Sequence, residues 1–205
     1  VSGVGKAVRL ITVPTLAERV SATRHCGSSL VNCQRKVSSI SARPSCRLPF
    51  VMATPEERIA DLGLELPEPA TPVGSYVTAK RSGNMLYVSG HGPIDTDGKS
   101  IRGKVGDALD VDQGYYAARR CGLGLLSTMR HHLGSLDRVT DIVKLLGMVN
   151  ATPDFGKQPA VINGASDLMV EVFGDAGRHA RSAVGMGSLP FDIAVEVELI
   201  VEISD

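Results

Sequence analysis

The sequence lacks several features that would assign it at once to a common class of protein. Its 205 residues include no tryptophan, only 4% aromatic residues and no apolar run near the roughly 18 residues that a membrane span needs. The P-loop, GxGxxG, HExxH and GxSxG signatures are also absent. With 43% hydrophobic residues, the chain still has enough apolar side chain to build a core. We therefore expect a folded domain that does not cross a membrane.

Cysteine is scarce and unevenly placed. Three of the four cysteines lie within residues 1–51, no CxxC pair is present, and Cys121 is the only cysteine that follows. A single thiol cannot form an internal disulfide, and it offers too few ligands for a structural zinc site. We therefore expect residues 52–205 to be a reduced, intracellular domain without a metal, with Cys121 packed in its core.

Acidic residues are nearly missing from the start of the chain. Residues 1–51 hold eight Lys/Arg, one acid (Glu18) and many serines. This composition is typical of a transit peptide, so we expect import into a mitochondrion or plastid. Two alternatives are a disordered tail and upstream sequence translated ahead of a true start at Met52, in which case the protein would be cytoplasmic.

The rest of the chain is acidic. Of the 22 Lys/Arg and 22 Asp/Glu in the whole chain, 22 − 8 = 14 basic and 22 − 1 = 21 acidic residues fall within 52–205. A net charge of about −7 repels polyanions, and the basic residues are scattered rather than gathered in a stripe. We therefore do not expect this part to bind nucleic acid.

Five segments have the composition of β-strands. The first two are short β-rich runs joined by a turn that contains Gly83, and the last alternates between apolar and mostly acidic positions. The third is apolar on both faces, which predicts a strand in the middle of the sheet. The predicted strands are residues 76–80, 85–89, 139–149, 180–186 and 195–203.

Two further segments have helical spacing. Asp110 and Gln113 resemble a capping box that begins a helix ending at Gly134. Pro159 can begin a second helix, which Gly174 ends. The predicted order is β-β-α-β-α-β-β, an α+β domain with a mixed sheet and two helices on one face.

Two residues stand out as candidates for chemistry. Arg181 lies in an apolar setting, where a lone guanidinium is costly unless it faces an anion. Glu196 lies inside the last predicted strand. An arginine can bind a carboxylate with two parallel N–H bonds, and a nearby carboxylate can move protons. On spacing alone, however, the favoured interpretation is structural: an arginine paired with a structural glutamate, and a glutamate on a solvated strand face.

Several motifs together resemble the RidA/YjgF family. They are Gly74-Ser75-Tyr76, Asn84-Met85-Leu86-Tyr87-Val88-Ser89-Gly90 and, most specifically, His179-Ala180-Arg181-Ser182-Ala183-Val184 with Leu189-Pro190 and Val195-Glu196-Val197-Glu198. The resemblance covers residues 73–203. It implies a chorismate-mutase-like fold for a single domain at 73–205, preceded by a proline-rich approach segment at 52–72. It also implies a homotrimer with active sites between subunits.

The resemblance also implies an activity and its site. The expected reaction is hydrolysis of 2-iminopropanoate and 2-iminobutanoate, reactive products of pyridoxal-phosphate-dependent dehydratases, without metal or organic cofactor. Arg181 would bind the substrate carboxylate and Glu196 would hold the attacking water. The family's other substrate-contacting positions fall on Tyr76, Ser89, Asn163 and Ala183.

This chain departs from the family pattern at two positions and in the length and composition of the loop 92–109. Ala183 stands where the family has cysteine, and His91 stands where a glutamine commonly follows Ser-Gly. Two other functions therefore stay open. One is a trimer that binds a small carboxylate without turning it over, and the other is a ribonuclease, against which the acidic composition argues.

Overall fold

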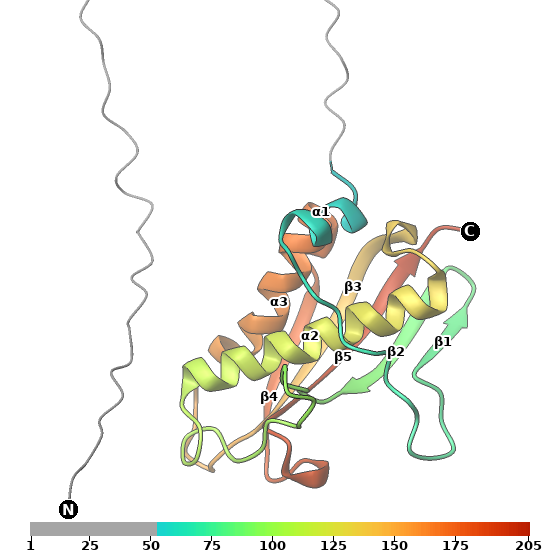
Figure 1. Cartoon of the computed structure of the whole chain (residues 1–205). Helices are drawn as coiled ribbons and strands as arrows, with labels where there is room; N and C mark the ends of the chain where they lie inside the picture. Colours follow the sequence, from blue (N-terminus) through green and yellow to red (C-terminus); the bar gives the residue numbers. More distant parts are fainter. Residues whose placement is uncertain (1–52) are drawn as a thin grey trace, which may run out of the picture. The chain divides into compact units, whose positions relative to one another are not determined.

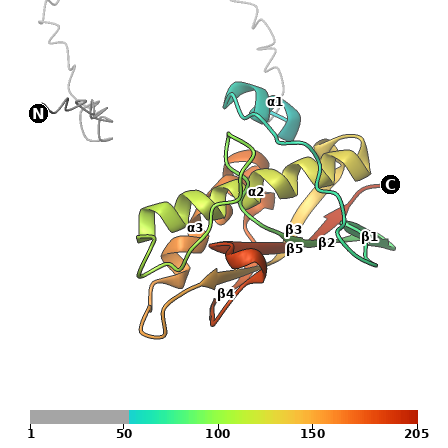
Figure 2. The ribbon, with the colours of Figure 1, turned by 60° about the horizontal axis from the view of Figure 1, so that its bottom comes forward.

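A five-stranded mixed sheet with two long helices on one face forms the body of the fold (Figure 1, Figure 2). The computed structural model describes residues 53–205, so the transit peptide expected at residues 1–51 lies outside the described residues. The helices are α1 (Pro55–Asp61), α2 (Val111–Leu133) and α3 (Gln158–Phe173), with short 3-10 turns at Leu136–Arg138, Gly174–Gly177 and Pro190–Asp192. The strands are β1 (Ala79–Ser82), β2 (Met85–His91), β3 (Val139–Asn150), β4 (Ala180–Met186) and β5 (Val195–Ile203).

The sheet has the order β1-β2-β5-β3-β4. All neighbouring strands are antiparallel except β3 and β4, which are parallel because α3 connects them. The strand that is apolar on both faces, β3, lies in the interior of the sheet, as predicted. The α+β class and the order of strands and long helices are likewise confirmed.

The first hairpin differs from its predicted boundaries. Strand β1 begins at Ala79 rather than at residue 76, and the chain reverses at Gly83, whose φ is +62°. Glycine adopts this left-handed conformation without steric cost, which allows a tight two-residue turn between Ser82 and Met85. Residues 76–78 therefore belong to the segment that precedes the sheet and not to β1.

Local signals set the ends of α2. The backbone N–H of Gln113 donates to Asp110 Oδ1 at 2.8 Å, and the N–H of Asp110 donates to Gln113 Oε1 at 2.9 Å. This reciprocal pair is the predicted capping box. At the other end Gly134 takes a left-handed φ of +80°, which allows the chain to leave the helix. No helix within residues 53–205 is long and apolar enough to cross a membrane.

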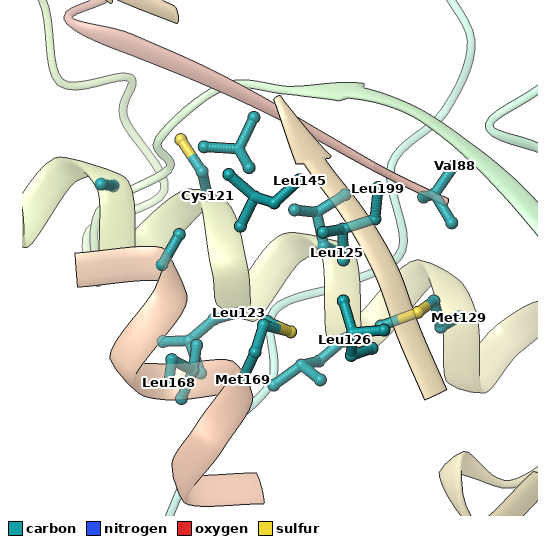
Figure 3. Close-up of a cluster of buried hydrophobic side chains, with 14 of the residues drawn as sticks. Val88, Cys121, Leu123, Leu125, Leu126, Met129, Leu145, Leu168, Met169 and Leu199 are labelled. Atoms are coloured by element: carbon teal, nitrogen blue, oxygen red, sulfur yellow. The ribbon is translucent and has the colours of Figure 1, made fainter. Parts of the chain in front are cut away.

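The core lies between the sheet and α2 and α3 (Figure 3). Leu145 and Leu199 from the sheet, Leu125 from α2 and Leu168 from α3 all belong to this core and are buried. Cys121 is fully buried among them, and its Sγ donates to the carbonyl of Val195 at 3.5 Å. The prediction of a packed core cysteine is therefore confirmed.

Candidate functional site

A cavity of about 720 Å³ lies beside the C-terminal end of β2. Residues 65–76, which include the end of the approach segment, line one side of it. Residues 90–100, from the end of β2 and the loop after it, line another side. Residues 190–193 and Glu196 close it from the C-terminal part of the chain. Concave sites of this size commonly bind small molecules.

Glu196 brings a carboxylate to this cavity. The backbone of Gly90 makes room for it, because a Cβ at that position would overlap Glu196 Oε1. Partial burial, and to a lesser extent the negative charge of Glu198 two residues along β5, raise the pKa of Glu196. A carboxyl group with a raised pKa is better able to accept and return a proton near neutral pH.

Tyr76 and Ser89 belong to the same side of the site. Tyr76 lines the cavity with its ring half exposed. Ser89 does not line it; instead its hydroxyl donates to the carbonyl of Val77 at 2.7 Å, and its N–H donates to the carbonyl of Thr78 at 3.0 Å. Ser89 therefore fastens to β2 the segment that carries Tyr76.

His91 is buried at the end of β2 and lines the cavity. Its Nδ1 lies 2.7 Å from the carbonyl of Ser89, which can only accept, so Nδ1 carries the proton. Nε2 is then an acceptor for the hydroxyl of Thr128 at 2.7 Å. Burial lowers the pKa of His91, which favours this neutral form. The histidine thus holds the backbone around Gly90, against which Glu196 packs.

Arg181 lies elsewhere, on the edge strand β4. Its Nη1 donates to Asn163 Oδ1 at 2.8 Å and to Ser166 Oγ at 3.0 Å, both on α3. Within residues 53–205 no carboxylate forms an ion pair with Arg181. The guanidinium is therefore held by neutral acceptors rather than by a described carboxylate, the arrangement expected of a group that binds an anion.

His179 forms a further hydrogen bond with Ser166. His179 Nδ1 lies 2.7 Å from the carbonyl of Gly177 and must donate to it, so Nε2 accepts the hydroxyl proton of Ser166 at 3.0 Å. The oxygen of Ser166 is thereby left to accept from Arg181. Burial, together with the positive charge of Arg181, lowers the pKa of His179, although the hydrogen bond to Gly177 opposes this.

The predicted site residues thus form two groups in one chain. Tyr76 and Glu196 both line the cavity, and Ser89 holds the segment that carries Tyr76. The second group lies on β4 and α3 and consists of Arg181, Asn163 and Ala183. The backbone of Ala183 pairs with Gly147 of β3.

The register of the sheet separates the two charged groups. Arg181 pairs with Leu145 and Glu196 pairs with Met148 on the strand between them. Side chains three positions apart on a strand point to opposite faces. Arg181 therefore faces α3, and Glu196 leaves the sheet on the other face.

Ser166 and His179 were not among the predicted site residues. Two local patterns could have indicated them. Asn163 and Ser166 are three residues apart on a helix and so share a face, and His179 lies two residues before Arg181, on the same side of an extended chain. Neither pattern shows that α3 packs on β4, and it is this packing that brings Ser166 close to His179 and Arg181.

A comparison with known families matches residues 56–203 to the family described as "YjgF/chorismate mutase-like, putative endoribonuclease". The chain belongs to the YjgF/RidA family. The match begins well before residue 73 and therefore includes α1 and most of the approach segment. The predicted family and its chorismate-mutase-like fold are confirmed.

Individual proteins are also similar to this chain over most of their length. Protein TCP17 of Trypanosoma cruzi is 48% identical over 145 residues, which is 70% of this chain and 91% of TCP17. The crystal structure of Atu1372 from Agrobacterium tumefaciens, a protein of unknown function, is 44% identical with a TM-score of 0.68, covering 73% of this chain and 92% of that one. A "putative endoribonuclease" from Shewanella oneidensis MR-1 is 35% identical with a TM-score of 0.71, covering 74% and 100%.

Proposed function

We propose that the protein hydrolyses small 2-imino acids, with 2-iminopropanoate and 2-iminobutanoate as the expected substrates, to 2-keto acids and ammonia. The observation that carries this proposal is the hydrogen bonding of the Arg181 guanidinium. Among the residues that the structure describes, only Asn163 and Ser166 accept from its guanidinium, so the remaining N–H groups keep the fork geometry that matches a carboxylate. Membership of the YjgF/RidA family supports an enzymatic role of this kind.

The chemistry follows from the two charged groups. Arg181 binds the carboxylate of the imino acid and so fixes the iminium carbon, C2, beside a water molecule. Glu196 accepts a proton from this water as its oxygen attacks C2, and a tetrahedral carbinolamine forms. The proton then passes to the nitrogen, the C–N bond breaks, and ammonia leaves as the C2 hydroxyl loses its proton to become the keto oxygen. Positioning and proton transfer account for the acceleration.

We infer that this site is assembled from two chains. Arg181 and Glu196 leave the sheet on opposite faces of one subunit, with β3 between their strands. A substrate held by both therefore needs Arg181 from one subunit and the cavity with Glu196 and Tyr76 from its neighbour. The homotrimer implied by the family resemblance satisfies this requirement, because a cyclic assembly repeats one such contact at each interface.

The charges around the cavity bear on the other two functions. Four carboxylates line it, from Glu65, Glu68, Asp95 and Glu196, and Arg120 is the only Lys or Arg among the lining residues. A phosphodiester chain would be repelled by this lining, which disfavours ribonuclease activity. A protein that only binds a carboxylate would use the same Arg181, so a measurement of imine hydrolysis distinguishes a binding protein from the proposed enzyme.

The test supplies fresh imine to the full chain. A threonine dehydratase generates 2-iminobutanoate in situ, and ammonia and keto-acid release are followed with wild type, Arg181→Lys and Glu196→Gln. Lysine keeps the charge but loses the fork, so kcat/KM should fall about 100-fold in Arg181→Lys. Glu196→Gln should lose turnover but still bind 2-oxobutanoate. Arg178→Lys, an exposed arginine three residues away, is the matched control and should behave as wild type.

Three results would overturn the proposal. Activity of Arg181→Lys within a few-fold of wild type would remove this residue from carboxylate binding. Binding of 2-oxobutanoate by a wild type that never accelerates imine hydrolysis would favour the binding protein instead. Cleavage of RNA that survives in Arg181→Ala would favour the ribonuclease.

A further inference from the structure

The turn at residues 190–193 has an unusual backbone. Phe191 has φ = 56° and ψ = 18°, and Asp192 has φ = 58°. They are the only non-glycine residues with positive φ within residues 53–205. The left-handed region is strongly disfavoured for a bulky residue such as phenylalanine, and two such residues in succession persist only where the surroundings impose them.

Hydrogen bonds that involve the buried Asn150 hold this conformation. Asn150, which is almost fully buried, donates from Nδ2 to Asp192 Oδ1 at 3.0 Å. Its Oδ1 accepts from Lys104 Nζ at 2.9 Å, and the carbonyl of Asp192 accepts from the N–H of Gly103 at 2.9 Å. The loop before α2 and the end of β3 therefore both hold Asp192, and with it the residue before it.

The strained turn presents an aromatic ring to the cavity that contains Glu196. Phe191 lines this cavity although its side chain is 73% exposed. Val73, Tyr76 and Ile94 are also exposed hydrophobic residues that line it. Apolar side chains gathered around one concave site indicate a binding surface rather than scattered exposure.

The cavity is also larger than the smallest substrates require. Cavities of roughly 300–1,000 Å³ accommodate drug-sized ligands, and this one measures about 720 Å³. A three-carbon imino acid held at its carboxylate by Arg181 and at C2 by Glu196 has only a methyl group with which to contact an apolar wall.

We propose that Phe191 is the wall of an apolar subsite for the substrate side chain, and that the protein prefers 2-imino acids with side chains larger than ethyl, such as those derived from leucine. This rests on the proposed function, because it takes Glu196 as the group beside C2. The polar contacts of Asp192 hold the ring in place before the substrate arrives, so that no ordering of the turn opposes binding.

The experiment compares two imines in Phe191→Asn. Asparagine tolerates the left-handed conformation, so this variant removes the ring and keeps the turn. A flavin-dependent L-amino-acid oxidase supplies the imines of leucine and alanine. For the leucine-derived imine kcat/KM should fall about tenfold or more, and for the alanine-derived imine it should change by less than about threefold. Leu62→Asn removes an exposed apolar residue outside the cavity and should change neither.

Other outcomes overturn the proposal or separate it from the proposed function. Equal losses on both imines, no loss on either, or a changed oligomeric mass of Phe191→Asn by light scattering would each overturn the subsite; a changed mass would make Phe191 a subunit contact. If wild type hydrolyses neither imine, the proposed function fails, and calorimetry with keto acids decides the subsite. Tighter binding of 4-methyl-2-oxopentanoate than of pyruvate, lost in Phe191→Asn, would support it, and equal binding by wild type would overturn it.

Discussion

Arg181 and Glu196 leave the sheet of one chain on opposite faces, at positions three residues apart in the register of β3. The guanidinium faces α3, where Asn163 and Ser166 hold it. The carboxylate belongs instead to the cavity at the end of β2. If both groups act on one substrate, each active site joins two chains.

This relationship predicts complementation between two inactive variants. Arg181→Ala and Glu196→Gln are each expected to be inactive. When they are unfolded together and refolded as a mixture, each site draws its two groups from different chains. About a quarter of the sites would then contain both native residues, so about a quarter of the wild-type activity should return. The same variants refolded separately and then mixed are the control. Mixed oligomers that stay inactive would contradict an inter-subunit site.

The proton-transferring role of Glu196 predicts a shift in the pH profile of Glu198→Gln. Burial and the charge of Glu198 raise the pKa of Glu196. Since the ionised form accepts the proton from water, kcat/KM falls as pH drops through this pKa. Removing the charge of Glu198 lowers the pKa of Glu196, so the acid limb should move to lower pH. The control is Glu202→Gln, further along the same face. An acid limb that stays in place or moves upward would exclude Glu196 as this base.

Much of the fold could be predicted because the signals that specify it are local. The capping box at Asp110 and the left-handed Gly134 set the ends of α2 through contacts within a few residues. The alternation in β5 similarly shows which of its faces is buried. The first hairpin was predicted less well, because Gly83 alone sets the turn and the β-rich composition extends beyond the paired residues.

The site depends on contacts between distant segments and was therefore only partly predictable. Arg181 and Glu196 could be identified from residue type and family resemblance. Their placement on opposite faces could not be predicted, because it depends on the position of β3 between β4 and β5. The sequence did not indicate a role for Phe191, because the hydrogen bond that holds its turn joins Asp192 to Asn150, 42 residues earlier in the chain.

The buried His91 predicts a pH dependence of stability. Its pKa in the folded protein is lowered by burial from the ordinary value of about 6.5. As pH falls below about 6.5, the unfolded chain binds a proton that the folded state resists, so stability is lost by up to about 1.4 kcal/mol per pH unit until the lowered pKa is reached.

The variant that isolates this effect is His91→Gln. Glutamine can still donate toward Ser89 and accept from Thr128, but it does not titrate. Urea unfolding of both proteins at pH 7.5 and 5.5 should show a larger loss of unfolding free energy in wild type. Since His132 and His179 titrate in both proteins, they cancel in this comparison. Equal losses would mean that His91 is protonated as readily in the folded state as in the unfolded chain.

The close contact between α2 and α3 predicts that Gly164→Ala is strongly destabilising. A Cβ at this position would overlap the backbone carbonyl of Tyr115, which cannot move without separating the helices. Alanine gains about 1 kcal/mol in helix propensity over glycine, but overpacking against backbone outweighs this gain, and we expect a net loss of about 2 kcal/mol or more in urea unfolding. Gly156→Ala is the matched control, because no atom lies within 4 Å of its added Cβ, and it should change stability by less than about 0.5 kcal/mol. A Gly164→Ala protein as stable as this control would show that the two helices can separate at little cost.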